Sequence, residues 1–466
     1  MSPQIPLSYR PAAFAAVIVV LAGCQTYRPA PLDLRAHAAA WEARDPASPG
    51  VWAYAQRLAL SDARGTDDAA FDPADGVSLR EAEAVALFFN PRLRAARLKA
   101  RVAAVGSAEA GRWEDPVLRV DAERILRAVE SPWVVGGLLN LTLPVSGRLA
   151  VEKGRAVAEA DVAWVNALLE ERRVLVELSA AWAELAVIDQ RTELTRSFLT
   201  DLDAIVDRAE KLRAAGELDP LEAGLFKVER VRRSAELRSL APQRREQELT
   251  LKALMGLTPA ARVGLVPSLP PPIDPSASFE RQRAIELHPQ LRLARAEYAV
   301  AERALELEVR RQYPDLALGG GYGRDEGVSR ILGGLSVPIP VFSANRRAIA
   351  EARANRDAAR GSAEATYEDL VSSLARAEAA LETARVQREV LEQELAPLAD
   401  QQLKAARDLG RLGAVNTVIV FEALTRAHAT RVEILEAAGR EAGARNKVNA
   451  LLRPTTGVGA AAKEER

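Results

Sequence analysis

Apolar residues recur every three or four positions along two very long stretches of this chain, Arg148 to Ala215 and Asn345 to Leu412. In the first stretch the repeat is carried by Leu168, Leu175, Leu178, Trp182, Leu185 and Ile188. This spacing predicts α-helices, and at about 1.5 Å per residue each would be roughly 100 Å long if unbroken. Helices of such length are expected to pack along one another like coiled coils. Pro397 should kink the second helix, because proline removes a backbone donor and clashes with the preceding turn.

Each long helical pattern leads to a lone glycine, Gly216 or Gly413, and then to another helical pattern. Glycine commonly closes a helix, and Asp219 and Asn416 are suitable N-caps for the helices that follow. Pro220 suits the first position of the first of these helices. Each pattern therefore predicts a helical hairpin with a tight turn at its tip.

The two hairpins belong to two copies of a longer unit, because shifting the sequence by about 197 positions aligns them. The aligned pairs include Asn90 with His288, Leu143 with Ile339, Gly216 with Gly413, Leu218 with Val415 and Glu236 with Glu433. We therefore expect one duplicated domain rather than two unrelated ones. The expected divisions are a signal peptide (1–23), a lipid-anchored tether (24–77), a first repeat (78–257), a Pro-rich linker (258–277), a second repeat (278–453) and a flexible tail (454–466).

Four short runs between the helices alternate as β-strands do. The odd positions from Val135 to Leu143 and from Ile331 to Ile339 are small or apolar, and polar residues fall between them. Two partner strands are expected at Pro116 to Ile125 and Asp315 to Tyr322; Arg119, Asp121 and Glu123 lie on one face of the first. Such strands could form a small sheet that covers a helix end. They also have the length of roughly 9 to 11 residues that crosses a bilayer, and because four strands cannot close a barrel, several chains would have to contribute.

The first residues read as an export signal. An apolar run from Ala12 to Leu21 follows Arg10 and is too short to span a bilayer. It ends in Leu21-Ala22-Gly23-Cys24, which resembles the bacterial lipobox, whose cysteine becomes acylated; a plain signal peptide is the alternative. Cys24 is the only cysteine, so no disulfide framework exists. By resemblance to the lipoprotein sorting rule, Gln25 at the next position favours the outer membrane.

In the order and duplication of these features, the chain from Ser78 to Leu452 resembles the TolC-type outer-membrane efflux channel family. The segments from Asp115 to Glu123 and from Leu143 to Arg148 are most similar to its cobalt-zinc-cadmium resistance branch. The resemblance implies a mainly α-helical fold with a small β part: a homotrimer with an α-helical periplasmic barrel and a 12-stranded transmembrane β-barrel, four strands per chain. It also implies a periplasmic adaptor protein and an inner-membrane pump as partners.

The resemblance places two kinds of site in the helical hairpins. The tips would dock the adaptor through Gly216, Leu218, Asp219, Gly413, Val415 and Asn416, and the four residues other than glycine are expected to be exposed. Glu222 and Glu422 would narrow the tunnel, or else lie on a solvated helix surface. Ile419 occupies a position where the family often has an acid, which puts a strict acidic gate in doubt.

Composition limits the other functions. The formal net charge of -1, with no basic cluster, gives no reason to expect nucleic acid. His37, His288 and His428 are the only histidines, and no catalytic motif or metal-ligand spacing is recognisable, so neither an enzyme nor a cofactor is expected. His288 is expected to cap a helix, as Asn90 would. A passive export duct for an unidentified cargo, with heavy-metal cations implied by the branch resemblance alone, is favoured over a periplasmic scaffold or adaptor lipoprotein that forms no pore.

Overall fold

The computed structural model describes residues 26–61, 71–124, 133–269, 278–325, 328–411 and 417–452. The chain forms two compact units, Met1–Arg44 and Asp45–Arg466. The smaller unit contains α2 (Leu34–Glu42), whose first turn is capped by the Asp33 carboxylate. All the features below lie in the larger unit.

The larger unit is built from long helices. Its helices are α3 (Pro49–Ser61), α4 (Leu79–Phe89), α5 (Pro91–Glu109), α6 (Arg148–Ala214), α7 (Pro220–Leu254), α8 (Ser278–Glu286), α9 (Pro289–Arg310), α10 (Arg346–Val390), the π-helical turn η2 (Leu391–Leu395), α11 (Ala396–Arg411) and α12 (Thr417–Leu452). The 67 residues of α6 confirm the first predicted long helix.

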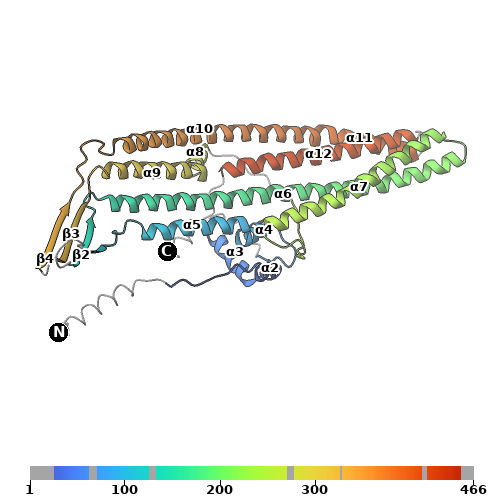
Figure 1. The fold of residues 1–466 in the computed structure, drawn as a ribbon. Helices are drawn as coiled ribbons and strands as arrows, with labels where there is room; N and C mark the ends of the chain where they lie inside the picture. The colour runs from blue at the N-terminus through green and yellow to red at the C-terminus, as the bar shows by residue number, and fades with distance from the viewer. Residues whose placement is uncertain are drawn as a thin grey trace. The chain divides into compact units, whose positions relative to one another are not determined.

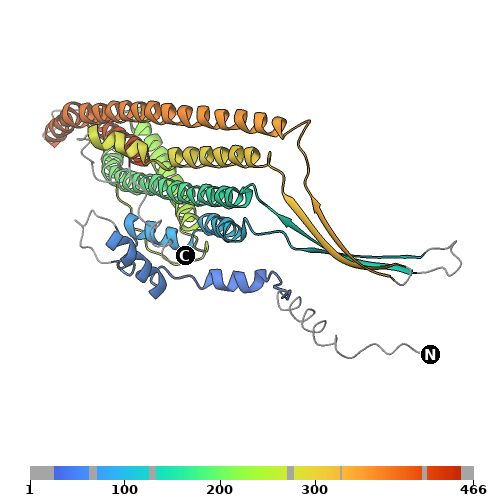
Figure 2. The same cartoon turned by 90° about the vertical axis from the view of Figure 1, so that its left-hand side faces the viewer.

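Four of these helices form a row in the order α5, α6, α9, α10, because α5 packs on α6, α6 on α9 and α9 on α10 (Figure 2). The return helices lie beside this row. Helix α7 packs on α6, whereas α12 packs on both α6 and α10 (Figure 1). Among the described residues, no helix is sufficiently long and apolar to cross a membrane.

The four strands form one antiparallel sheet at one end of the row. They are β1 (Val117–Arg124), β2 (Trp133–Leu143), β3 (Leu316–Asp325) and β4 (Val328–Ser336), and they lie side by side in sequence order. The strands have the same order as the helices of the row to which they are connected: β1 follows α5, β2 precedes α6, β3 follows α9 and β4 precedes α10. Within the described chain, β1 and β4 are edge strands with no partner on their outer side.

Two details of the second repeat differ from the simplest expectation. Strand β4 ends at Ser336 instead of Ile339, because Pro338 and Pro340 cannot donate to the strand ladder. Near Pro397, where a kink was predicted, the helix contains the π-helical turn η2, which ends two residues before the proline. A π-turn relieves the clash between the proline ring and the preceding turn while the helix continues.

The duplication is visible in the way each repeat closes. Asn90 caps α5, accepting from the backbone N–H groups of Arg92 and Leu93, and its side-chain amide donates to the carbonyl of Leu254 at the end of α7. His288 caps α9 through Nδ1, which accepts from the N–H of Gln290, and it bonds the carbonyl of Ala450 at the end of α12. The expectation that His288 caps a helix as Asn90 does is confirmed.

The main core lies where the first repeat closes. Trp182, Leu178 and Leu185 of α6 are fully buried against Met255 and Val85. The tether joins this core through α3: Val51 is fully buried, and the Tyr54 ring lies 5.6 Å from that of Phe88. The residues 45–61 therefore pack as part of the larger unit.

Candidate functional site

The turn between α6 and α7 has the predicted geometry. Gly216 adopts a left-handed backbone with φ of 78°. Its N–H donates to the carbonyl of Arg213, and the N–H of Glu217 donates to that of Leu212 at 2.9 Å. These bonds satisfy the last carbonyls of α6, as glycine closures of helices do. A left-handed conformation is costly for a residue with a Cβ, which explains the glycine.

Helix α7 begins immediately after this turn. The Asp219 carboxylate accepts from the N–H of Leu221 at 2.7 Å, and Pro220 occupies the first helical position. The predicted N-cap is confirmed. Asp219 is exposed at the tip, as expected.

The prediction that Leu218 is exposed is wrong. Its side chain is only 7% exposed and packs with Ala223 and Phe226. The Phe226 ring meets the Phe421 ring of α12 edge to face, with 4.9 Å between their centroids. The turn is so tight that Leu218 folds back onto α7, so it holds the tip together from inside.

Part of the predicted tip surface, and the predicted lipidation site, lie outside the described residues. These are Gly413, Val415 and Asn416 of the second turn, and Cys24 near the N-terminus. The exposed apolar residues next to the first tip are instead Leu221, Leu225, Val228 and Val231 on α7.

The two candidate gate residues differ in their surroundings. Glu222 is half-buried in the first turn of α7, where a carboxylate is favoured by the helix dipole. Glu422 of α12 has a side chain that is 70% exposed and lies 3.9 Å from Arg426. Ile419 is exposed one turn earlier. The position of Glu222 in the first turn of α7 thus has an explanation in the helix dipole that requires no gate.

The strand register gives the sheet two chemically different faces. Paired residues on one face are apolar or glycine in most positions: Leu118, Val120, Ala122, Val135, Gly137, Leu139, Leu141, Leu318, Gly320, Tyr322, Ile331, Gly333 and Leu335. The opposite face carries Arg119, Asp121, Glu123, Asn140, Thr142, Arg330 and Ser336, with glycines and apolar residues such as Leu138 and Leu332 between them. The apolar positions that alternate along β2 and β4 in the sequence therefore lie on the same face of one sheet.

A partly exposed ion cluster at the base of the sheet was not predicted from the sequence. Arg148, the first residue of α6, bonds Glu114 at 2.8 Å, Asp315 at 3.0 Å and Glu152 at 3.1 Å. Asp315 directly precedes β3, and Glu114 lies three residues before the start of β1. Arg148 therefore ties together three of the connections between helices and strands.

Two buried histidines carry perturbed pKa values. Burial, and next the nearby Arg172 guanidinium, lowers the pKa of His288 to about 4, although its bond to the Ala450 carbonyl acts in the opposite direction. Burial also lowers the pKa of His428 to about 4. The His428 ring stacks on Phe198 with 4.3 Å between centroids, and its Nε2 atom has no hydrogen-bond partner. Both rings are therefore neutral at pH 7.

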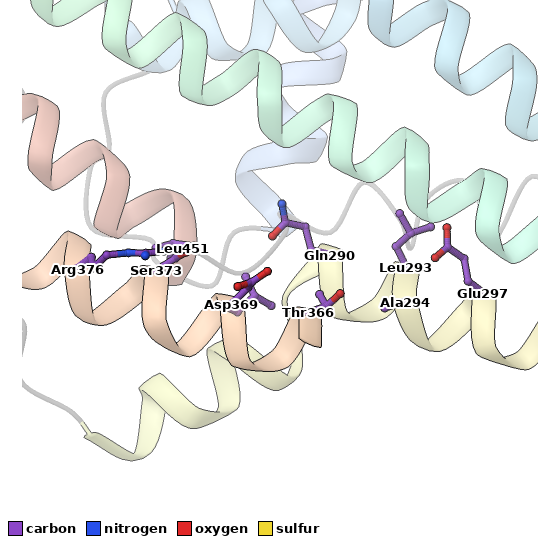
Figure 3. Close-up of a pocket in the computed structure, with 10 residues that line it drawn as sticks. Gln290, Leu293, Ala294, Glu297, Thr366, Asp369, Ser373, Arg376 and Leu451 are labelled. Carbon is purple, nitrogen blue, oxygen red and sulfur yellow. Dashed lines mark hydrogen bonds between the residues drawn. The ribbon is translucent and has the colours of Figure 1, made fainter. Parts of the chain in front are cut away.

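A shallow groove of about 630 Å³ lies between α9, α10 and the end of α12. It is lined by Gln290, Leu293, Ala294, Glu297, Thr366, Asp369, Leu370, Ser373, Arg376 and Leu451. Figure 3 shows the polar side chains spread along the groove rather than directed at one point. Among the described residues, no group of three or more histidine, cysteine or acidic side chains could hold a metal ion. The groove thus offers a packing surface rather than a set of converging ligands.

Comparisons with known proteins agree with this architecture. Residues 281–452 match the outer membrane efflux protein family. The cobalt-zinc-cadmium resistance protein CzcC of Cupriavidus metallidurans is 24% identical over 324 residues, which cover 67% of this chain and 76% of that protein.

Solved structures extend the likeness to nearly the whole fold. The outer-membrane channel OprN superimposes with a TM-score of 0.71 at 17% identity, covering 93% of this chain and 99% of OprN. The outer membrane protein VceC of Vibrio cholerae gives a TM-score of 0.68 at 16% identity, covering 81% of this chain and 96% of VceC. The CmeC outer membrane channel of Campylobacter jejuni gives 0.69 at 13% identity, covering 88% and 94%. The duplicated helices and four-stranded sheet therefore have the fold of these solved outer-membrane channels, and residues 281–452 are similar to the outer membrane efflux protein family.

Proposed function

We propose that this protein is the outer-membrane channel of a tripartite efflux system, a passive duct that carries cargo from a pump and adaptor across the periplasm and outer membrane. The two-faced sheet carries the proposal. A mostly apolar face suits lipid, the opposite face with its charged side chains suits a water-filled interior, and both edges of the sheet are unpaired within the described chain.

Three copies of the chain would complete the duct. Edge strands in a membrane must be paired, because lipid cannot satisfy their backbone groups. Three sheets of four strands joined at β1 and β4 make a closed barrel of twelve, and the helices continue it as a tunnel. The tips at Gly216 and Gly413 would meet the adaptor. The similarity to CzcC supports heavy-metal cations as the cargo.

A duct requires no catalytic chemistry of its own. The described residues hold no converging catalytic constellation, and the energy for transport would come from the inner-membrane pump. A periplasmic scaffold without a pore is the competing function, and the two differ in whether the purified protein conducts ions.

Single-channel recording tests the proposal. The purified full-length protein, inserted into a planar lipid bilayer, should give discrete conductance steps. A matched sample with Gly320→Glu, which puts a charge on the apolar face of β3, should insert far less often. A wild-type protein that binds membranes without ever conducting would favour the scaffold instead.

We further propose that Cys24 is the acylated N-terminal residue of the mature protein. The motif Leu21-Ala22-Gly23-Cys24 supports this, and two acyl chains would suffice for stable anchoring. Intact mass spectrometry should show cleavage before Cys24 and the added mass of a diacylglyceryl group. In Cys24→Ser the modification should vanish while the fold is kept, since the barrel also holds the protein in the membrane. An unmodified Cys24 in the wild type would disprove the anchor.

A further inference from the structure

Two helical hairpins of the same chain meet at the end of the row that lies away from the sheet (Figure 1). The first hairpin consists of α6 and α7, and the second contains α11 and α12. Helix α12 packs along α6, and α11 packs on α12. The contact between α12 and the first hairpin therefore holds the two hairpins together within one chain.

This contact is an apolar seam. Near the first tip, Phe421 of α12 meets Phe226 of α7 edge to face. Farther from the tip, Leu424 of α12 is buried with Phe198 and Leu202 of α6. Removal of these side chains from water is the main source of attraction between the two hairpins.

The seam also contains a histidine. His428 of α12 is 4% exposed and stacks on Phe198 with 4.3 Å between the ring centroids. Its Nε2 atom has no hydrogen-bond partner among the described residues. The hydroxyls of Thr195, one turn before Phe198, and of Thr425, one turn before His428, are also buried without a described partner. Because a buried polar atom without a partner costs free energy, the seam is less stable here than in its apolar part.

The charged side chains around His428 are paired with one another. They are Arg191 of α6, Glu229, Arg233 and Glu236 of α7, Asp400 of α11, and Arg431 and Glu436 of α12. The Arg233 guanidinium lies 5.5 Å from the centroid of the Phe198 ring, so a positive charge is already close to the ring on which His428 stacks. None of these carboxylates bonds Nε2 of His428. A protonated His428 would therefore be buried beside Arg233 and without an acceptor for its Nε2 proton.

We propose that His428 is an acid-sensitive latch between the two hairpins of one chain. The neutral ring closes the seam by stacking on Phe198. The protonated ring is stable only in water, so it leaves the seam, and the part of α12 nearer the tips separates from α6. Acid therefore shifts the equilibrium from closed to separated hairpins.

The pH range of the latch follows from the two states of the ring. Burial lowers the pKa of His428 to about 4 in the closed seam, whereas a ring in water has the ordinary value of 6.5. The closed seam is thus favoured fully above pH 6.5, and the separated state gains as the pH falls towards 4. Between pH 7 and pH 5 the equilibrium constant for separation should rise on the order of ten-fold.

His288 provides a matched control. Burial lowers its pKa to about 4 as well, but it lies at the start of α9 and its ring is bonded to the backbone of Gln290 and Ala450. A general effect of acid on buried histidines should act through both rings. The latch acts through His428 alone.

Hydrogen exchange measured by mass spectrometry tests the latch in the purified full-length protein. Division by the intrinsic exchange rate at each pH gives the protection of the amides from Val418 to His428, which reports local separation of α12. In the wild type and in His288→Asn this protection should fall on the order of ten-fold from pH 7 to pH 5, while the protection of α5 is unchanged. His428→Gln should give the same α12 protection at both pH values. His428→Lys, which carries a charge at either pH, should give low protection already at pH 7.

The possible results separate the latch from other effects of acid and from the channel. Equal α12 protection in the wild type at pH 7 and pH 5 would overturn the latch, and so would an equal fall in the wild type and His428→Gln. A fall of the same size in every helix would mean general unfolding and would also contradict it. All the groups involved belong to one chain, so the inference does not rest on the proposed function: a working latch in a protein that never conducts would stand without the channel.

Discussion

Acidification from pH 7 to pH 5 is expected to lower the stability of the folded protein, and two buried histidines should account for most of the loss. His288 and His428 have folded-state pKa values of about 4, below the value of 6.5 expected for an exposed ring. Between these pH values the unfolded chain takes up protons that the folded protein excludes, so stability is full above pH 6.5 and falls as the pH drops towards 4. At pH 5 the loss is at most about 2 kcal/mol per histidine, and residual hydration of the rings makes it smaller.

Three acidic groups with lowered pKa values titrate in a different pH window. Glu177, Glu236 and Glu441 have pKa values below 4.5, held there by neighbouring arginines against the opposing effect of burial. The contribution of these three glutamates to the stability of the folded protein is present above pH 4.5 and is lost only as the pH falls further. Burial raises the pKa of Glu171, against the effect of Arg97, so protonation of this carboxyl acts in the opposite direction to the histidines and a histidine variant is needed to isolate their contribution.

The double variant His288→Asn, His428→Gln should flatten this dependence. Asparagine is suitable at 288, because Asn90 already caps the corresponding helix and bonds the corresponding carbonyl. Thermal unfolding in detergent at pH 7, 6 and 5 would measure the effect, with exposed His37→Asn as the control. An equal fall in the unfolding temperature for the wild type and the double variant would show that other groups cause the acid sensitivity.

Features with a local cause were predictable from the sequence. The glycine closure at Gly216, the N-cap at Asp219 and the first-turn Pro220 follow from backbone conformation within a few residues, and all three are confirmed. The strands were predictable because the period of two is set by the backbone. The role of His288 as a helix cap was predictable because the duplication aligns it with Asn90.

Features that depend on contacts across the fold were not predictable. Leu218 follows a glycine turn, which suggests exposure, yet Phe226 and Phe421 cover it from two different helices. Arg148 gives no sign in the sequence that Asp315, from the other repeat, lies 3.0 Å away. The exposed apolar residues Leu98, Val102 and Val105 of α5 were also missed, since a helix with apolar residues on two sides shows little hydrophobic periodicity in its sequence.

Changing the tip glycine is expected to stop export while the channel remains in the outer membrane. In Gly216→Val a β-branched residue must adopt a φ of 78°, which costs on the order of 1 to 2 kcal/mol. A Cβ at this position would meet no atom within 4 Å, so the cost is backbone strain and not a clash. Local strain of this size leaves the trimer intact but shifts the turn, with Asp219 and the start of α7, away from the adaptor. Outer-membrane abundance and export of cargo from cells should be measured together, and Gly413→Val is the matching change in the second tip.

Gly216→Asn provides the control at the same position. Asparagine tolerates the left-handed backbone far better than valine does, so this variant should export nearly as well as the wild type. If backbone geometry is the cause, export should therefore follow the residue's tolerance of positive φ rather than its size. Equal loss of export in the asparagine and valine variants would mean that the glycine surface itself touches the adaptor. Normal export by Gly216→Val and Gly413→Val at normal abundance would remove the tips from the docking surface, and the exposed residues Leu221 and Leu225 on α7 would become the next positions to test.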